Sequence, residues 1–235
     1  MDNKKILALG DSLALPGHRT AYESTWICRL KNEYPAADFI TYFRRSLTSD
    51  VLVSLGGGEN DSGPPGCDCL EIFKPHFVIL QMGIVDCAPR LFSALTRKII
   101  LARLPNWLRS VTIKIAKKTR SRRAGRTDVP PERYKKNLDT YFKRCEISAV
   151  EKVIIIKICY PDARMRKKNP GIVGSLKLYN QLIDEVAQKY ASVHVVDPLD
   201  TRQSTEQIFD EDGYHPNGMG HERVYQAVSA VLSKR

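Results

Sequence analysis

The sequence lacks long apolar runs. None of its hydrophobic stretches approaches the roughly 18 residues that a membrane-spanning helix needs. Met1 to Lys5 lead directly into a strand-like run, without the hydrophobic core and small-residue cleavage site of a secretion signal. We therefore expect a cytoplasmic protein, in which 43% hydrophobic residues are enough to build a core.

Cysteines with the spacing of a metal site are also missing. The six cysteines are scattered along the chain, and free thiols are expected in a cytoplasmic protein. Cys67-Asp68-Cys69 has the wrong spacing for a zinc knuckle, and no second Cys/His pair complements it. The glycine-rich stretch 56–66 lacks the Lys-Ser/Thr pair of a phosphate-binding loop. We predict neither a metal nor an organic cofactor.

Acidic residues are scarce in one segment only. The whole chain has 37 Lys and Arg against 26 Asp and Glu, a net charge of +11. Residues 96–136 hold 14 of the basic residues and 2 of the acidic ones. The rest of the chain has 23 basic and 24 acidic residues and is close to neutral. The basic character therefore belongs to one segment and not to the fold.

Apolar runs of strand length alternate with stretches of helical period. Strands are expected at 6–9, 38–43, 77–82, 152–159 and 193–197. Helices are expected at 21–34, 91–115 (broken at Pro105), 133–147, 175–190 and 220–233, with a polar loop over 160–174. This alternation predicts a single α/β domain over 1–235, with a mainly parallel five-stranded sheet covered on both faces.

The turn after the first expected strand carries the first chemical signal. Gly10-Asp11-Ser12-Leu13 follows that strand, and ligands of open α/β sheets bind beyond the carboxyl ends of the strands. Ser12 is therefore well placed for a nucleophile, next to a helix start whose N–H groups suit an oxyanion. The alternative is an ordinary strand–turn–helix in which Ser12 is an N-cap, and the motif alone does not separate the two.

A second signal follows the last expected strand. Asp212 and His215 lie three residues apart, so a tight turn lets the carboxylate hold one imidazole nitrogen while the other faces Ser12. Histidine suits general-base work near neutral pH. An isolated Asp-x-x-His is usually an ordinary loop, but its pairing with an early Gly-Asp-Ser-Leu favours acyl transfer chemistry.

With both motifs in hand, the sequence resembles the SGNH (GDSL) hydrolase family over most of its length. Gly10-Asp11-Ser12-Leu13 is similar to the first block of that family, and 212–217 is similar to the last. The resemblance implies a flavodoxin-like three-layer α/β/α sandwich that acts on acyl esters of lipids, carbohydrates or other alcohols. It also implies that Ser12 is the nucleophile, His215 the base and Asp212 its partner.

The third block of the family is altered here. The family has Gly-x-Asn-Asp after the central strand, where the Asn donates to the oxyanion, whereas this chain has Gly83-Ile84-Val85-Asp86. Val85 donates nothing from its side chain, and loss of one such donor typically costs about 10²–10³ in rate. A literal Gly-x-Asn-Asp occurs at 58–61, but it precedes the expected strand 77–82 and is predicted at the opposite end of the sheet.

The second block is altered as well. The family supplies a glycine N–H after strand two, whereas Arg44-Arg45-Ser46-Leu47 contains no glycine. A non-glycine backbone N–H still serves, and an arginine here suits an anionic substrate. We predict an oxyanion and substrate site built from Ser12, Ser46, Gly83, Val85, Arg45 and Arg90.

Three functions agree with an intact triad and an altered oxyanion site. The preferred one is a serine esterase or deacylase that removes an O-acyl group from a carbohydrate through an acyl–Ser12 intermediate, in surface-polysaccharide biosynthesis. The second is an acyltransferase, or a deacylase with an unusual substrate. The third is a non-catalytic protein that binds glycans or membrane surfaces, although retention of Ser12, Asp212 and His215 argues against it.

The basic helical insertion, residues 91–136, has its own alternatives. It is either a lid with a solvated face, or an interfacial segment in which Trp107 and its apolar neighbours accompany Arg and Lys. The latter predicts peripheral membrane or acidic-glycan contact through 96–136. Nucleic acid ranks last because no nucleic-acid motif accompanies the charge. Oligomeric state has no signal in the sequence.

Overall fold

The computed structural model describes residues 3–54, 66–92, 126–200 and 207–234, with 96, 102–105, 107–109, 111, 112 and 114 between them. Five strands form one sheet in the order β2-β1-β3-β4-β5, and every neighbouring pair is parallel. The strands are β1 (Lys5–Gly10), β2 (Asp38–Phe43), β3 (Phe77–Gln81), β4 (Lys152–Ile156) and β5 (Val193–Val196). The prediction of five strands is confirmed, and this sheet is parallel throughout.

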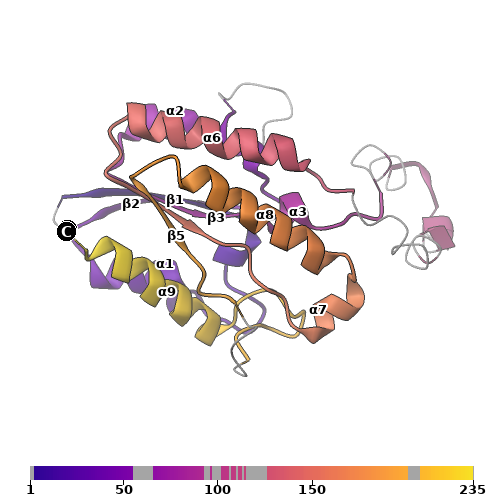
Figure 1. Ribbon diagram of the computed structural model, residues 1–235. Helices are drawn as coiled ribbons and strands as arrows, with labels where there is room; N and C mark the ends of the chain where they lie inside the picture. The colour runs from indigo at the N-terminus through magenta and orange to yellow at the C-terminus, as the bar shows by residue number, and fades with distance from the viewer. Residues whose placement is uncertain are drawn as a thin grey trace.

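Helices cover both faces of the sheet (Figure 1). On one face α6 packs against α2 and α8, and on the other α1 packs against α9. Their bounds are α1 (Trp26–Glu33), α2 (Gly66–Phe73), α6 (Pro131–Ile147), α8 (Ile172–Ala187) and α9 (Gly218–Leu232). The predicted three-layer α/β/α sandwich is confirmed, with the strand order of flavodoxin-like sheets.

The sheet is held by apolar side chains on both faces of its central strands. All of β3 is buried, and the last five residues of β1 are buried as well. The edge strand β2 is only half-buried, because it has a neighbouring strand on one side only. Each large apolar side chain moved out of water contributes roughly 1.5–3 kcal/mol, so the central strands fix the frame on which the loops sit.

Two element predictions need correction. The helix expected from residue 21 begins at Trp26, because the Thr25 hydroxyl caps it by accepting from the Cys28 N–H. The preceding Tyr22–Ser24 form a separate 3₁₀ turn. The polar loop expected over 160–174 contains helix α7 (Ala163–Lys168), which Asp162 caps through two backbone N–H groups. The short helix α3 (Ile84–Cys87) and helix α2 were not predicted.

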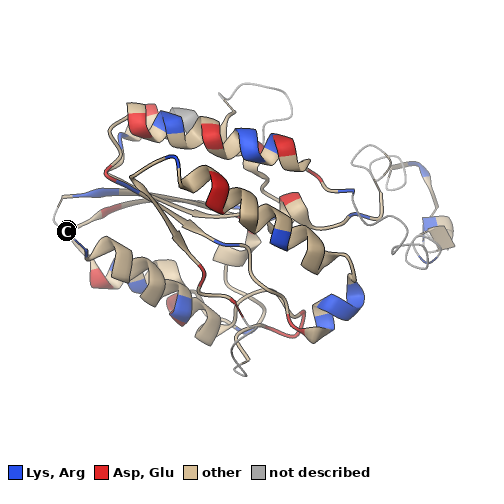
Figure 2. Cartoon of the chain, in the orientation of Figure 1, with Lys and Arg blue, Asp and Glu red and all other residues tan. Residues whose placement is uncertain are grey.

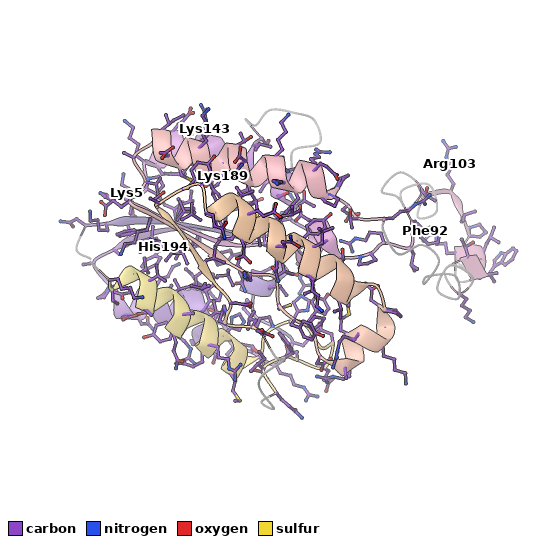
Figure 3. The ribbon with its side chains drawn as sticks, viewed as in Figure 1. Lys5, Phe92, Arg103, Lys143, Lys189 and His194 are labelled. Carbon is purple, nitrogen blue, oxygen red and sulfur yellow. The ribbon has the colours of Figure 1, made fainter. Side chains whose placement is uncertain are left out.

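About half of the basic insertion lies outside the described residues, including all of 115–125. Residues 55–65 also lie outside them, and these contain most of the glycine-rich stretch and all of the literal Gly-x-Asn-Asp. Figure 3 places Phe92 and Arg103 apart from the three layers, on the side opposite Lys5 at the amino end of β1. The described part of the insertion therefore lies toward the carboxyl ends of the strands. In the residues that can be placed, no helix is long and apolar enough to cross a membrane.

Candidate active site

The strand order brings three loops together at one edge of the sheet. β1 lies between β2 and β3, so the chain leaves this edge after Gly10, Phe43 and Gln81 at neighbouring positions. Connections that run to different sides from adjacent strands open a crevice there. Ser12, Ser46 and Val85 follow these three strands and line one cavity.

The Ser12 hydroxyl is not used to cap the helical turn that follows β1, because Asp11 provides the cap. Ser12–Ala14 form a 3₁₀ turn, η1, and its N-cap is Asp11, whose Oδ1 accepts from the Leu13 N–H at 2.9 Å. The alternative in which Ser12 is the N-cap is therefore wrong. A Cβ on Gly10 would lie 2.9 Å from the Ala14 Cβ and 3.1 Å from the Gln81 carbonyl, so only glycine fits this turn.

Ser12, His215 and Asp212 form a continuous chain of hydrogen bonds. The His215 Nε2 lies 3.0 Å from the Ser12 Oγ, and the His215 Nδ1 lies 2.5 Å from the Asp212 Oδ2. The two outer residues are separated by 200 positions in the sequence. Nucleophile, base and orienting carboxylate thus have the mutual geometry of an acyl-transfer triad.

The loop that carries the base is built as a tight turn. Asp212 Oδ1 accepts from the backbone N–H groups of Tyr214 and His215, both at 3.1 Å. Gly213 has a φ of +85°, and the Asp210 N–H donates to the His215 carbonyl at 2.8 Å, which closes the turn. Partial burial alone would raise the pKa of Asp212, but the hydrogen bonds from His215 and the backbone outweigh it and lower the pKa. The carboxylate therefore stays ionised beside His215.

Two further carboxyl groups are buried next to the lining residues Ser12 and Val85. Asp11 is completely buried, and loss of hydration raises its pKa to about 7, with a smaller contribution from the charge of Asp86. Burial likewise raises the pKa of Asp86 to about 6, although hydrogen bonds from Ser49 partly offset the rise. Neither residue lines the cavity, so both support the loops that do.

The altered second and third blocks take distinct positions. Ser46 lines the cavity with a φ of +62°, the left-handed region that glycine occupies without strain. Val85 also lines the cavity, with an apolar side chain only 7% exposed. Gly83 is not in the lining: its φ is +123°, and a Cβ there would lie 2.8 Å from Ile158 and Tyr134 atoms. Gly83 therefore shapes the turn into α3.

The two predicted arginines differ in their pairing. Arg90 lines the cavity, but its Nη2 donates to the Val85 carbonyl at 3.0 Å and pairs with Asp128 at 2.8 Å. Arg45 is exposed at the cavity, and within the described part of the chain it has no ion pair. Figure 2 shows further positive charge on α7, the helix that carries the lining residue Met165. Arg45 is thus the better placed of the two for an anionic group.

The cavity has a volume of about 380 Å³ and includes polar residues that sequence reasoning missed. Asn169 and Asp210 line it together with the predicted residues, and so does Tyr214, whose ring centre lies 4.3 Å from that of His215. The sequence holds no signal for Asn169, which follows α7 in a segment expected to be a loop. Among the residues that the structure describes, no group of three or more His, Cys, Asp or Glu side chains could hold a metal ion. Free thiols are found at Cys28, Cys69, Cys87, Cys145 and Cys159.

Comparison with known proteins agrees with this geometry. The profile of the GDSL-like lipase/acylhydrolase family matches residues 6–228. No curated protein matches the chain by sequence.

Solved structures give the same fold at low identity. A lipase/acylhydrolase from Enterococcus faecalis superposes with a TM-score of 0.61 at 17% identity, over 97% of this chain and 95% of that one. A catalytic mutant of an acetylxylan esterase from Geobacillus stearothermophilus has a TM-score of 0.61 at 16% identity, over 100% and 97% of the two chains. An α/β hydrolase from the metagenome of Lake Arreo, Spain, has a TM-score of 0.60 at 17% identity, over 97% and 94%.

Proposed function

Since the chain belongs to the GDSL-like lipase/acylhydrolase family and is a hydrolase of ester bonds, we propose that it removes an O-acyl group from a carbohydrate. The observation that carries the proposal is the hydrogen-bond chain from Ser12 through His215 to Asp212. Its geometry suits an acyl–enzyme mechanism that uses only groups of this chain.

In this mechanism the Ser12 Oγ attacks the ester carbonyl carbon while His215 Nε2 takes the hydroxyl proton. The tetrahedral intermediate collapses, the bond to the alcohol oxygen breaks, and His215 returns the proton to that oxygen. Water then attacks the acyl–Ser12 ester by the same proton transfers and releases the acid. Asp212 holds the imidazole in position and stabilises its charged form.

Backbone N–H groups are the best candidates for the oxyanion site. The side chain of Val85 offers no donor where the family has Asn. The N–H groups of Ser12 and Ser46 both lie in residues that line the cavity, and neither donates to an acceptor within the described part of the chain. They are free to stabilise charge on the carbonyl oxygen, which supports an active enzyme with fewer donors than its relatives.

A carbohydrate acceptor is favoured by the chemistry of the cavity. Amide, carboxylate and guanidinium groups lie in its lining alongside the triad. Sugar hydroxyls need donors and acceptors of this kind, whereas an acyl chain of a lipid needs an apolar channel. One of the superposed structures is that of an acetylxylan esterase, which gives the proposal a precedent on this scaffold.

The proposal is tested by fluorophosphonate labelling of wild type, Ser12→Ala and His215→Ala, with turnover of p-nitrophenyl acetate measured alongside. We expect labelling and turnover in the wild type and the loss of both in the two variants. A folded wild type that neither labels nor turns over the ester contradicts the proposal.

A cytoplasmic location, a role in surface-polysaccharide biosynthesis and contact of 96–136 with acidic glycans or a membrane surface remain predictions. Salt-sensitive binding of an acidic glycan or of anionic liposomes that survives Ser12→Ala would support the last of these.

A further inference from the structure

The side-chain amide of Asn169 is buried in the lining of the cavity and makes no hydrogen bond in the described structure. The residue is 1% exposed, and neither its Oδ1 nor its Nδ2 has a hydrogen-bond partner in the described structure. Its backbone is fully used: its N–H donates to the Met165 carbonyl at 2.9 Å, and its own carbonyl accepts from the Ile172 N–H at 3.0 Å. The turn between α7 and α8 is thus made by main-chain bonds and does not need the amide.

Such an arrangement is unfavourable for the free protein. A buried amide without a partner destabilises a fold by roughly 1–3 kcal/mol relative to a paired one, so it is expected where a ligand supplies the partner. Two other polar atoms in the same lining are also buried and unpartnered in the described structure, Asp210 Oδ2 and Arg90 Nε. Together the three residues offer amide, carboxylate and guanidinium groups, which are both donors and acceptors.

The position of Asn169 indicates which half of the ester it meets. Asn169 follows β4, and Asp210 and His215 follow β5, so all three lie beyond β3 as seen from Ser12. Ser46 and Val85 instead follow β2 and β3, the two strands that flank β1. His215 has to protonate the oxygen of the departing alcohol, so the alcohol half of the substrate must lie against His215. The acyl oxygen then lies toward Ser46 and Val85.

We propose that Asn169 determines acceptor specificity by donating to and accepting from hydroxyl groups of a sugar in the alcohol half of the ester, with Asp210 as a second acceptor. This assignment rests on the proposed function and names the residue that recognises its substrate class. A hydroxyl can donate to the amide Oδ1 and accept from the Nδ2 group, so a polyhydroxylated ring satisfies both atoms at once.

The test compares two acetate esters that share a six-membered ring. Mono-O-acetylated methyl xyloside carries free hydroxyls, whereas cyclohexyl acetate carries none. We expect Asn169→Leu to lower kcat/KM for the xyloside roughly 10- to 100-fold, mainly through KM, because the lost contacts are with bound substrate. Turnover of cyclohexyl acetate should stay within about twofold, and Asn169→Ala should show the same selectivity.

A stability measurement separates substrate recognition from a structural role. Asn169→Leu removes an unpartnered amide, so Tm should stay unchanged or rise. The matched control is Asn180→Leu: the Asn180 Oδ1 accepts from the Ile158 N–H at 2.8 Å and its Nδ2 donates to the Ile158 carbonyl at 2.9 Å, so Tm should fall.

Three results overturn the assignment: an equal loss for both esters, no loss for either, or a fall in Tm like that of Asn180→Leu. A wild type that hydrolyses neither ester contradicts the proposed function itself, and the assignment with it. The two failures are therefore distinguishable.

Discussion

The carboxylate of Asp86 joins two loops of the active site, because its Oδ1 accepts a hydrogen bond of 2.8 Å from the backbone N–H of Ser49. Asp86 belongs to α3, after β3, and Ser49 begins the 3₁₀ turn η3 (Ser49–Leu52), after β2. Asn137 of α6 extends the connection by donating to the Ser49 hydroxyl at 3.0 Å. Buried polar contacts outside the cavity thus hold the loops that carry Ser46 and Val85.

Removal of this connection should destabilise the two loops that carry Ser46 and Val85. Asp86→Ala leaves the buried Ser49 N–H without its acceptor, so we expect the free energy of unfolding to fall by about 1–3 kcal/mol. Activity on p-nitrophenyl acetate should fall as well. Asp86→Asn keeps an acceptor oxygen and should retain most of both. Urea unfolding and steady-state kinetics of the pair check this, and equal behaviour of the two variants would contradict it.

The parts of the fold and site that are encoded locally could be predicted from the sequence. The apolar runs of β1, β3 and β4 identify the sheet because strands buried on both faces need uninterrupted hydrophobic sequence. Gly10 to Leu13 and 212–215 are short motifs in which each residue has a local role. The alternation of strands and helices places both motifs at the carboxyl edge, so the triad follows.

Features that depend on tertiary contacts could not be predicted. Ser46 takes a left-handed backbone conformation although serine has no preference for it. Asn169 looks like an exposed loop residue until α7 and α8 fold over it. Asp11 appears in the sequence only as part of the motif around Ser12, whereas the fold makes it a buried cap with a pKa of about 7. The burial of Asn169 depends on how its two flanking helices pack, and the pKa of Asp11 depends on burial and on Asp86 of another loop.

The raised pKa of Asp11 makes stability depend on pH. The pKa is about 7 in the folded protein against 3.8 for an ordinary Asp, so the folded state holds the proton more tightly. The resulting stabilisation is complete below about pH 4 and is lost as the pH rises through 7. Asp11→Asn cannot ionise. We therefore expect the difference in unfolding free energy, wild type minus variant, to decrease from pH 4 to pH 8.

Urea unfolding of wild type and Asp11→Asn at several pH values measures this difference, which corresponds to about 1.4 kcal/mol for each unit of pKa difference. A constant difference between the two proteins across that range would show that Asp11 does not titrate there.

The negative charge of Asp212 should matter more than its shape. Asp212→Asn keeps the side-chain size but removes the charge that orients and stabilises the His215 imidazole. We expect kcat for p-nitrophenyl acetate to fall about 10²- to 10⁴-fold with little change in Tm. The exposed neighbour Glu211 is a matched control, because Glu211→Gln removes a surface charge that pairs only with exposed Arg19 among the described residues. A similar loss in both variants would contradict a specific role for Asp212.

The backbone at Ser46 should favour glycine. A non-glycine residue at a φ of +62° is strained by roughly 1 kcal/mol, so Ser46→Gly should raise the unfolding free energy by up to about that amount. The β-branched Ser46→Val should lower it. Ser192 provides the control: it has no positive φ, and Ser192→Gly should destabilise through the greater chain entropy of the unfolded state. Urea midpoints that place Ser46→Gly below wild type would contradict the expectation.

Val85 offers the most direct test of why the oxyanion site differs from that of the family. Val85→Asn places an amide donor on the cavity wall where the triad lies, and one such donor is typically worth about 10²–10³ in rate. We expect kcat for p-nitrophenyl acetate to rise at least about 10-fold with KM little changed, and Val85→Leu, which adds no donor, not to raise it. Fluorophosphonate titration of active sites corrects both values for the fraction of folded enzyme.

A rise confined to Val85→Asn would mean that a single missing donor limits the chemistry of an otherwise complete triad. An unchanged kcat would mean that the backbone N–H groups of Ser12 and Ser46 already stabilise the oxyanion as fully as this loop allows.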